Sequence, residues 1–170
     1  MKRNLFLVII TCLSFLAGCE SEKAAKNIDL SKNWRFAPDE KNIGVDDKWF
    51  ATDFDDSDWK ILNAGLKWEE QGFPKLDAFG WYRKSVVVPK SWKGEPVWLK
   101  FAAVNDAYTL YVNGEKVSFF GEANISVAAR PTFTEISKNL RYGKANQITV
   151  QVNDWGGSGG LWRLPVVHRR

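Results

Sequence analysis

The residues best suited to binding a ligand lie in a glycine-rich stretch near the C-terminus. Four of the five residues 156–160 are Gly, and Trp155 and Trp162 flank the run. The stretch is not a phosphate-binding loop, because it lacks Gly-Lys-Ser/Thr and no helical pattern follows it. Two interpretations fit. The stretch is either a connection whose flanking Trp rings fill a core, or a rim loop whose exposed Trp faces meet the C–H face of a sugar ring.

One Trp face cannot hold a sugar alone. Burial of about 100 Å² gives roughly 2.5 kcal/mol at about 25 cal/mol per Å², whereas millimolar binding needs about 4 kcal/mol. Polar groups must therefore add hydrogen bonds to the sugar hydroxyls. Asn105, Asp106, Arg130 and Arg163 are the candidates, although Asp106 and Arg130 fit a structural pair equally well. Trp68, in a segment with little strand pattern, is a further aromatic candidate.

Residues suited to catalysis are scarce. His168 is the only histidine and lies two residues from the C-terminus, where a fixed catalytic triad is not expected. A glycosidase needs two carboxylates about 5 to 9 Å apart across a cleft, but the acids here gather in one turn or are scattered over polar strand faces. We therefore expect no catalytic residues.

A short run is rich in carboxylates that could gather around calcium. It contains Asp53, Asp55, Asp56 and Asp58. The run is not an EF-hand loop, because the sixth and twelfth positions counted from its first residue are Asp58 and Ala64 rather than Gly and Glu. The favoured alternative is an Asx-type turn that directs Trp59 into the core. We expect no cofactor, and a structural calcium ion stays an open alternative.

The first residues have the pattern of an export signal. Lys2 and Arg3 precede an apolar run at 5–16, which is shorter than the roughly 20 residues that cross a membrane. The sequence Leu-Ala-Gly-Cys that ends at Cys19 resembles the bacterial lipobox, which implies cleavage after residue 18 and lipidation of Cys19. Ordinary signal cleavage is the alternative. Residues 20–27 then form a polar tether.

Composition excludes several classes of protein. The 170 residues include 24 Lys and Arg against 20 Asp and Glu, and loss of Lys2 and Arg3 with the signal leaves a net charge of about +2. Without a basic run, a nucleic-acid partner is rejected. The folded part has no Cys, so it is not a disulfide scaffold. No linker or repeat divides residues 28–170, which we expect to form one domain.

Apolar residues from Ile28 onward alternate with period two between turn signals, which predicts an all-β sandwich. Asn113-Gly114 is the strongest hairpin signal, and Pro165 suggests an edge strand. Helical turns are expected only at 46–50 and 137–140. The expected strands are 81–88, 97–101, 107–112, 115–120, 147–152 and 161–167. Four tryptophans in strand-like or turn motifs are assigned to the core: Trp34, Trp59, Trp81 and Trp98.

Six blocks in order resemble the jelly-roll sugar-binding domain of family 2 glycoside hydrolases, within the galactose-binding-like superfamily. Accessory domains of sialate O-acetylesterases are similar. The resemblance implies a galactose-binding-like jelly-roll β-sandwich over residues 28–170. The blocks are Trp34-Arg35-Phe36, Phe54-Asp55-Asp56-Ser57-Asp58-Trp59, Gly80-Trp81-Tyr82-Arg83-Lys84, Tyr111-Val112-Asn113-Gly114, Asn146-Gln147-Ile148-Thr149-Val150 and Gly159-Gly160-Leu161-Trp162-Arg163.

The sequence ends at Arg170, before any barrel or esterase domain. We therefore expect a non-catalytic module that binds an oligo- or polysaccharide and is held by lipid on a bacterial outer membrane or cell surface, with a glycoside hydrolase as a further partner. The alternatives are a protein-docking or structural module, and the N-terminal part of a hydrolase or esterase.

Overall fold

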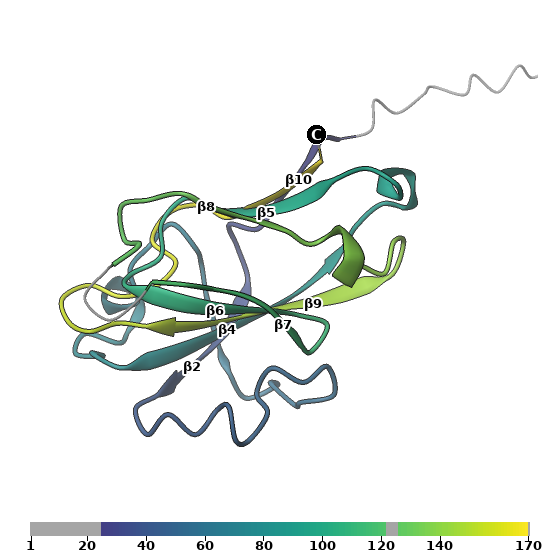
Figure 1. Ribbon diagram of the computed structural model, residues 1–170. Helices are drawn as coiled ribbons and strands as arrows, with labels where there is room; N and C mark the ends of the chain where they lie inside the picture. Colours follow the sequence, from purple (N-terminus) through teal and green to yellow (C-terminus); the bar gives the residue numbers. More distant parts are fainter. Residues whose placement is uncertain (1–24, 122–125, 170) are drawn as a thin grey trace, which may run out of the picture.

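The protein is a sandwich of two antiparallel sheets, as the computed structural model in Figure 1 shows. The structure describes residues 25–121 and 126–169. The expected all-β jelly-roll sandwich is confirmed. No helix in these two ranges is long and apolar enough to cross a membrane. The proposed signal at 1–18, Cys19 and most of the tether lie outside the described residues.

The smaller sheet has four strands in the order β1-β10-β5-β8, and the larger has six in the order β3-β2-β4-β9-β6-β7. Three short 3₁₀ turns lie in the connections. The strands of the smaller sheet are β1 (Asn27–Asp29), β10 (Val166–Arg169), β5 (Val97–Phe101) and β8 (Thr132–Glu135). Those of the larger sheet are β3 (Lys60–Leu62), β2 (Trp34–Asp39), β4 (Phe79–Val87), β9 (Ala145–Asn153), β6 (Ala107–Val112) and β7 (Glu115–Phe120). The turns are η1 (Glu69–Gln71), η2 (Lys90–Trp92) and η3 (Ser137–Asn139).

Period-two alternation fills the space between the sheets. On β9, Ile148, Val150 and Val152 are fully buried in the main core, while their neighbours point to the opposite face of the sheet. Trp34 and Trp81 are fully buried, as expected. Trp59 and Trp98 are only half-buried.

The strand predictions hold in the middle of the chain and fail near its end. Asn113 and Gly114 form the β6–β7 hairpin turn with φ of 53° and 84°, which confirms the turn predicted there. The last strand begins only at Val166 and lies between β1 and β5, so the edge position inferred from Pro165 is wrong. Pro165 lies just before the strand, where the N–H that proline lacks is not needed for pairing. Its carbonyl accepts a hydrogen bond from the Leu30 N–H at 3.2 Å.

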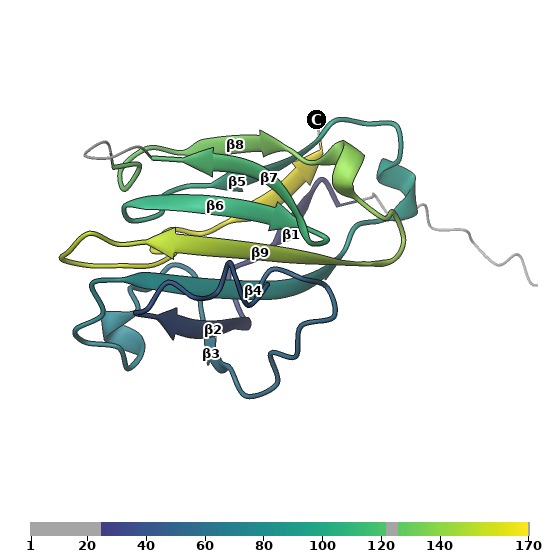
Figure 2. The same ribbon diagram turned by 60° about the horizontal axis from the view of Figure 1, so that its bottom comes forward.

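Residues 40–59, here called the covering segment, lie over the outer face of the six-stranded sheet (Figure 2). Trp49 packs edge-on against Trp81 at 6.0 Å between ring centres. Phe50 stacks on Tyr111 at 4.6 Å. The segment therefore packs on the sheet through an aromatic cluster of its own. Trp49 and Phe50 of the predicted turn at 46–50 are part of that cluster.

Arg83 ties the covering segment to β4. It is buried, and its Nε lies 2.7 Å from Asp56 Oδ2. Its guanidinium also donates to the carbonyls of Trp49, Ala51 and Phe54. These bonds compensate for removing a charge from water.

The acidic run has a structural role at two of its residues. Asp55 Oδ1 accepts the Ser57 N–H at 3.0 Å, which is the favoured Asx turn, and this bonding lowers the pKa of Asp55. Asp56 is paired with Arg83. Across 25–121 and 126–169, no group of three or more His, Cys, Asp or Glu side chains is arranged to hold a metal ion.

The substitution Arg83→Met is expected to lower the free energy of unfolding by about 2–4 kcal/mol, because it removes the donor to Asp56 and to the carbonyls of Trp49 and Phe54. Urea unfolding followed by Trp fluorescence measures the change. Arg141→Ala, at an exposed position, serves as the control and should stay within about 0.5 kcal/mol of the native protein. Equal stability of the native protein and Arg83→Met would show that the segment does not depend on this ion pair.

Candidate functional site

The glycine-rich loop, residues 154–161, leaves the end of β9 and is held by carboxylates from four places in the chain. Each carboxylate accepts one backbone N–H of the loop at 3.0–3.2 Å. The donor and acceptor pairs are Trp155 with Asp106, Gly156 with Asp154, Gly157 with Asp77 and Gly159 with Glu69. The loop is therefore fixed in position rather than a loose connection between strands.

Close packing under the loop explains two of its glycines. A Cβ on Gly159 would overlap the Trp68 indole. Gly160 has a φ of 109°, and a Cβ there would lie 2.7 Å from the Tyr82 hydroxyl. The backbone can approach these rings only because it carries no side chain.

Trp68 is not a binding platform, which corrects the expectation from sequence. Its side chain is fully buried beneath the loop, and its backbone N–H donates to the Gly159 carbonyl at 3.2 Å. Its ring packs against Phe36 with 5.7 Å between ring centres. Lack of strand pattern around Trp68 indicated a loop correctly, but the indole serves to fill the space under a second loop.

The two tryptophans that flank the glycines have different surroundings. Trp155 is 43% exposed. Trp162 is half-buried, and the Arg163 guanidinium lies over its ring, 4.6 Å from the ring centre. The interpretation in which both rings plug the sandwich is therefore wrong for Trp155.

Asn105 and Trp162 come together at a small pocket at this rim, here called the rim pocket. It has a volume of about 180 Å³, and Lys67, Ala128 and Ser158 complete its lining. The Asn105 amide donates to the Ser158 carbonyl, and Lys67 Nζ donates to the Ser158 hydroxyl at 3.0 Å. Two of the predicted binding residues, distant in sequence, thus share one cavity.

The other predicted polar residues lie outside this lining. Asp106, joined to Asn105 by a cis peptide bond, uses Oδ2 to hold the Trp155 N–H. The proposed Asp106–Arg130 pair is not formed in the described part of the chain, where the single ion pair is Arg83–Asp56. Arg130 and Arg163 are exposed beside the rim pocket's lining residues Ala128 and Trp162 in sequence.

Asp154 is the most perturbed acid of the loop. Its side chain is only 2% exposed, and Oδ2 has no hydrogen-bond partner. Burial, with a smaller contribution from the nearby charges of Asp106, Glu69 and Asp77, raises its pKa to about 6 against the lowering effect of the Gly156 N–H. Folding therefore places a carboxyl group where its charged form is disfavoured.

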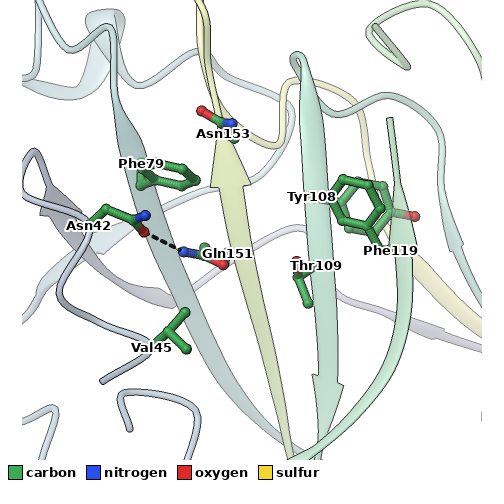
Figure 3. Close-up of a pocket in the computed structure, with 8 residues that line it drawn as sticks. All are labelled: Asn42, Val45, Phe79, Tyr108, Thr109, Phe119, Gln151 and Asn153. Atoms are coloured by element: carbon green, nitrogen blue, oxygen red, sulfur yellow. Dashed lines mark hydrogen bonds between the residues drawn. The ribbon is translucent and has the colours of Figure 1, made fainter. Parts of the chain in front are cut away.

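A second candidate cavity lies on the outer face of the six-stranded sheet and was missed from sequence (Figure 3). This sheet-face pocket has a volume of about 280 Å³. Its lining residues are Asn42, Val45, Phe79, Tyr108, Thr109, Phe119, Gln151 and Asn153. The alternating polar residues of β9 were a signal for it, but they fit an ordinary solvated strand face equally well.

The substitution Asp154→Asn is expected to stabilise the protein above pH 6 by about 1–3 kcal/mol. The folded-state pKa of about 6 exceeds the ordinary 3.8, so the carboxyl lowers the free energy of unfolding progressively as pH rises between these values. Asn keeps an acceptor for the Gly156 N–H without the charge. Urea unfolding at a series of pH values should show the two proteins diverging over this interval.

Asp58→Asn, at an exposed position, is the matched control and should follow the native pH profile. Parallel pH profiles for the native protein and Asp154→Asn would contradict the proposed burial of charge.

Comparison with known proteins points to one family. Residues 62–163, more than half of the chain, match the family described as glycosyl hydrolases family 2, sugar binding domain. The chain is 28% identical over 145 residues to a beta-galactosidase of Psychromonas ingrahamii, covering 74% of this chain and 13% of that protein. It is also 28% identical over 128 residues to a beta-glucuronidase of Paenibacillus borealis, covering 74% and 21%. The chain thus spans 13% and 21% of the length of these two relatives.

Solved structures agree on the fold. The beta-glucuronidase of Lactobacillus rhamnosus superposes with a TM-score of 0.73 at 21% identity, covering 84% of this chain and 28% of that one. The beta-glucuronidase of Ruminococcus gnavus gives 0.72 at 18% identity, covering 84% and 28%. With the matched region running from β3 through the glycine-rich loop, the chain belongs to the sugar-binding domain family of the family 2 glycosyl hydrolases.

Proposed function

We propose that this protein is a carbohydrate-binding module whose rim pocket contacts the sugar. The observation that carries the proposal is the convergence of Trp162 and Asn105 on one cavity beside a firmly held loop. An aromatic ring offers a face for sugar C–H groups, and the amide offers both a donor and an acceptor to hydroxyls. Lys67 and Ser158 add two further polar groups at the same cavity.

The order of the loop supports this role. Four carboxylates hold its backbone before any ligand arrives, so binding needs little further ordering of the chain. Trp155, exposed on the same loop, provides an outer surface that a longer oligosaccharide reaches.

Binding without turnover is the proposed activity. His168 lies in β10 with its ring against Phe133 at 6.5 Å between ring centres, which makes it part of a sheet surface. The matched relatives are named beta-galactosidases and beta-glucuronidases. We therefore place galactosides and glucuronides first among the sugars to test, with a hydrolase as the partner that acts on the bound glycan.

Attachment to a bacterial cell envelope through lipid is a separate part of the proposal. It is supported by the basic start, the apolar run at 5–16 and the Leu-Ala-Gly-Cys sequence that ends at Cys19. Several acyl chains on one Cys would hold the domain at the membrane surface while the sandwich stays in water.

Cys19→Ala is expected to move the protein from the membrane fraction to the soluble exported fraction, because it removes the acyl acceptor. Fractionation and mass measurement of the full chain expressed in a Gram-negative host check this. Cys12→Ala, inside the apolar run, is the control and should leave the distribution unchanged. An unmodified Cys19 in the native protein would refute the anchor.

Trp162→Ala is expected to weaken glycan binding by roughly tenfold, because it removes the ring that lines the rim pocket. Trp155→Ala should have a smaller effect, since that ring lies outside the pocket lining. Affinity electrophoresis through gels containing galactan or a glucuronide polymer measures the losses.

Leu164→Ala is the control, because Leu164 is an exposed apolar residue two positions further on. It should migrate as the native protein does. Equal retention of Trp162→Ala and Leu164→Ala would refute the rim pocket as the binding site, and retention of no glycan by the native protein would refute the proposed function.

A further inference from the structure

The register of the six-stranded sheet brings distant residues into rows on its outer face. One row crosses the sheet through Trp81, Gln151, Thr109 and Phe119, which are cross-strand partners on β4, β9, β6 and β7. Two residues away, Phe79 pairs with Asn153. Successive residues of a strand alternate between faces, so both rows lie on the face opposite the main core.

The covering segment hides only part of this face. Trp81 lies beneath it and donates its indole N–H to Asp39 Oδ2 at 2.9 Å. At the edge of the segment, Asn42 Oδ1 accepts a hydrogen bond from Gln151 Nε2 at 3.2 Å. Figure 3 shows Asn42, Val45 and Phe79 on one side of Gln151, with Phe119 on the other. Between these sides lies the sheet-face pocket of about 280 Å³.

The pocket offers hydrogen-bonding groups that the protein itself does not use. In the described ranges, no hydrogen bond engages the Thr109 hydroxyl or the Asn153 side-chain amide, and the amide of Asn42 and the oxygen of Gln151 are also free. These groups supply both donors and acceptors. A purely apolar ligand would leave them unpaired, at a cost in affinity.

The lining also carries no charge. All eight lining residues are neutral, and Lys116, which lies 5.8 Å from the centre of the Phe119 ring, is not among them. A charged ligand would therefore lose its hydration without gaining an ionic partner. Phe119 is 53% exposed and adds an aromatic surface beside the amides.

From these observations we infer a second, separate binding site, in which the sheet-face pocket holds a neutral sugar ring with its hydroxyls on Gln151, Asn153 and Thr109 and its C–H face against Phe119. The volume lies just below the range of about 300–1,000 Å³ usual for drug-sized ligands, which suits a single ring. The pocket shares no lining residue with the rim pocket, so it stands whether or not the rim binds.

Side-chain amide signals in ¹H–¹⁵N spectra of the full chain test this site directly. The probes are the methyl glycosides of galactose, glucose, xylose and mannose, with glucuronate as the charged counterpart. At least one neutral probe is expected to shift the amides of Gln151 and Asn153 with saturation in the millimolar range, whereas glucuronate should leave them unmoved. Absence of shifts with every neutral probe at tens of millimolar, or equal shifts with glucuronate, would overturn the inference.

Matched variants separate binding from general effects on the fold. Phe119→Ala should weaken the neutral sugar about tenfold, and Asn153→Leu about fivefold. Phe133→Ala is the control, because Phe133 is 48% exposed on the other sheet and has Lys100 over its ring at 5.6 Å, much as Phe119 has Lys116. Equal losses of sugar affinity in Phe119→Ala and Phe133→Ala would also overturn the inference of a sheet-face site.

Trp162→Ala distinguishes the two sites. If it removes glycan retention yet leaves the Gln151 and Asn153 shifts intact, both sites bind independently. If the native protein shows these shifts but its rim variants change nothing, the rim proposal fails and the sheet-face site stands.

Discussion

The antiparallel pairing of β4 with β9 is the constraint on which the rest of the molecule depends. It is nine residues long, from Phe79 with Asn153 to Val87 with Ala145, and lies at the centre of the six-stranded sheet. A shift of β9 by one residue against β4 would exchange the two faces of β9. Ile148, Val150 and Val152 would then leave the core, and Gln151 and Asn153 would enter it without partners.

The same pairing explains why carboxylate side chains are concentrated at one end of the sheet. At the Val87 end, the Asn113 amide in the β6–β7 turn donates to Asn146 Oδ1, which also accepts the Arg141 N–H of the connection that leads into β9. At the Phe79 end, β9 runs into a loop whose N–H groups have no strand to pair with. Acceptors must come from side chains, and four carboxylates supply them. This solution also concentrates negative charge, which adds to burial, the main cause of the raised pKa of Asp154.

The sequence was informative where local signals decide the structure. Asn113-Gly114 has its own turn preference, and alternation marks β5, β6 and β7 to the residue. Asn105 and Trp162 were each named as sugar-binding candidates from their residue types, but only the structure shows that they line one pocket. The burial of Trp68 could not be read in the same way, because it depends on how closely the glycine-rich loop approaches from about 90 residues away. Pro165 misled for a related reason, since its position before β10 became clear only once β1 and β5 were seen on either side.

The sheet-face pocket was beyond sequence reasoning because each of its walls has a different origin. Its floor is the polar half of β9, its far wall is Phe119 on the edge strand, and its near wall is formed by Asn42 and Val45 near the start of the covering segment. That segment keeps its position through Arg83, Asp39 and stacked aromatic rings. None of these groups lines the cavity, whereas Asn42 of the segment does. An opening of this kind exists because the segment covers the sheet as far as Gln151 and no further. The residues that shape the site are therefore those that determine how much of the sheet the covering segment covers.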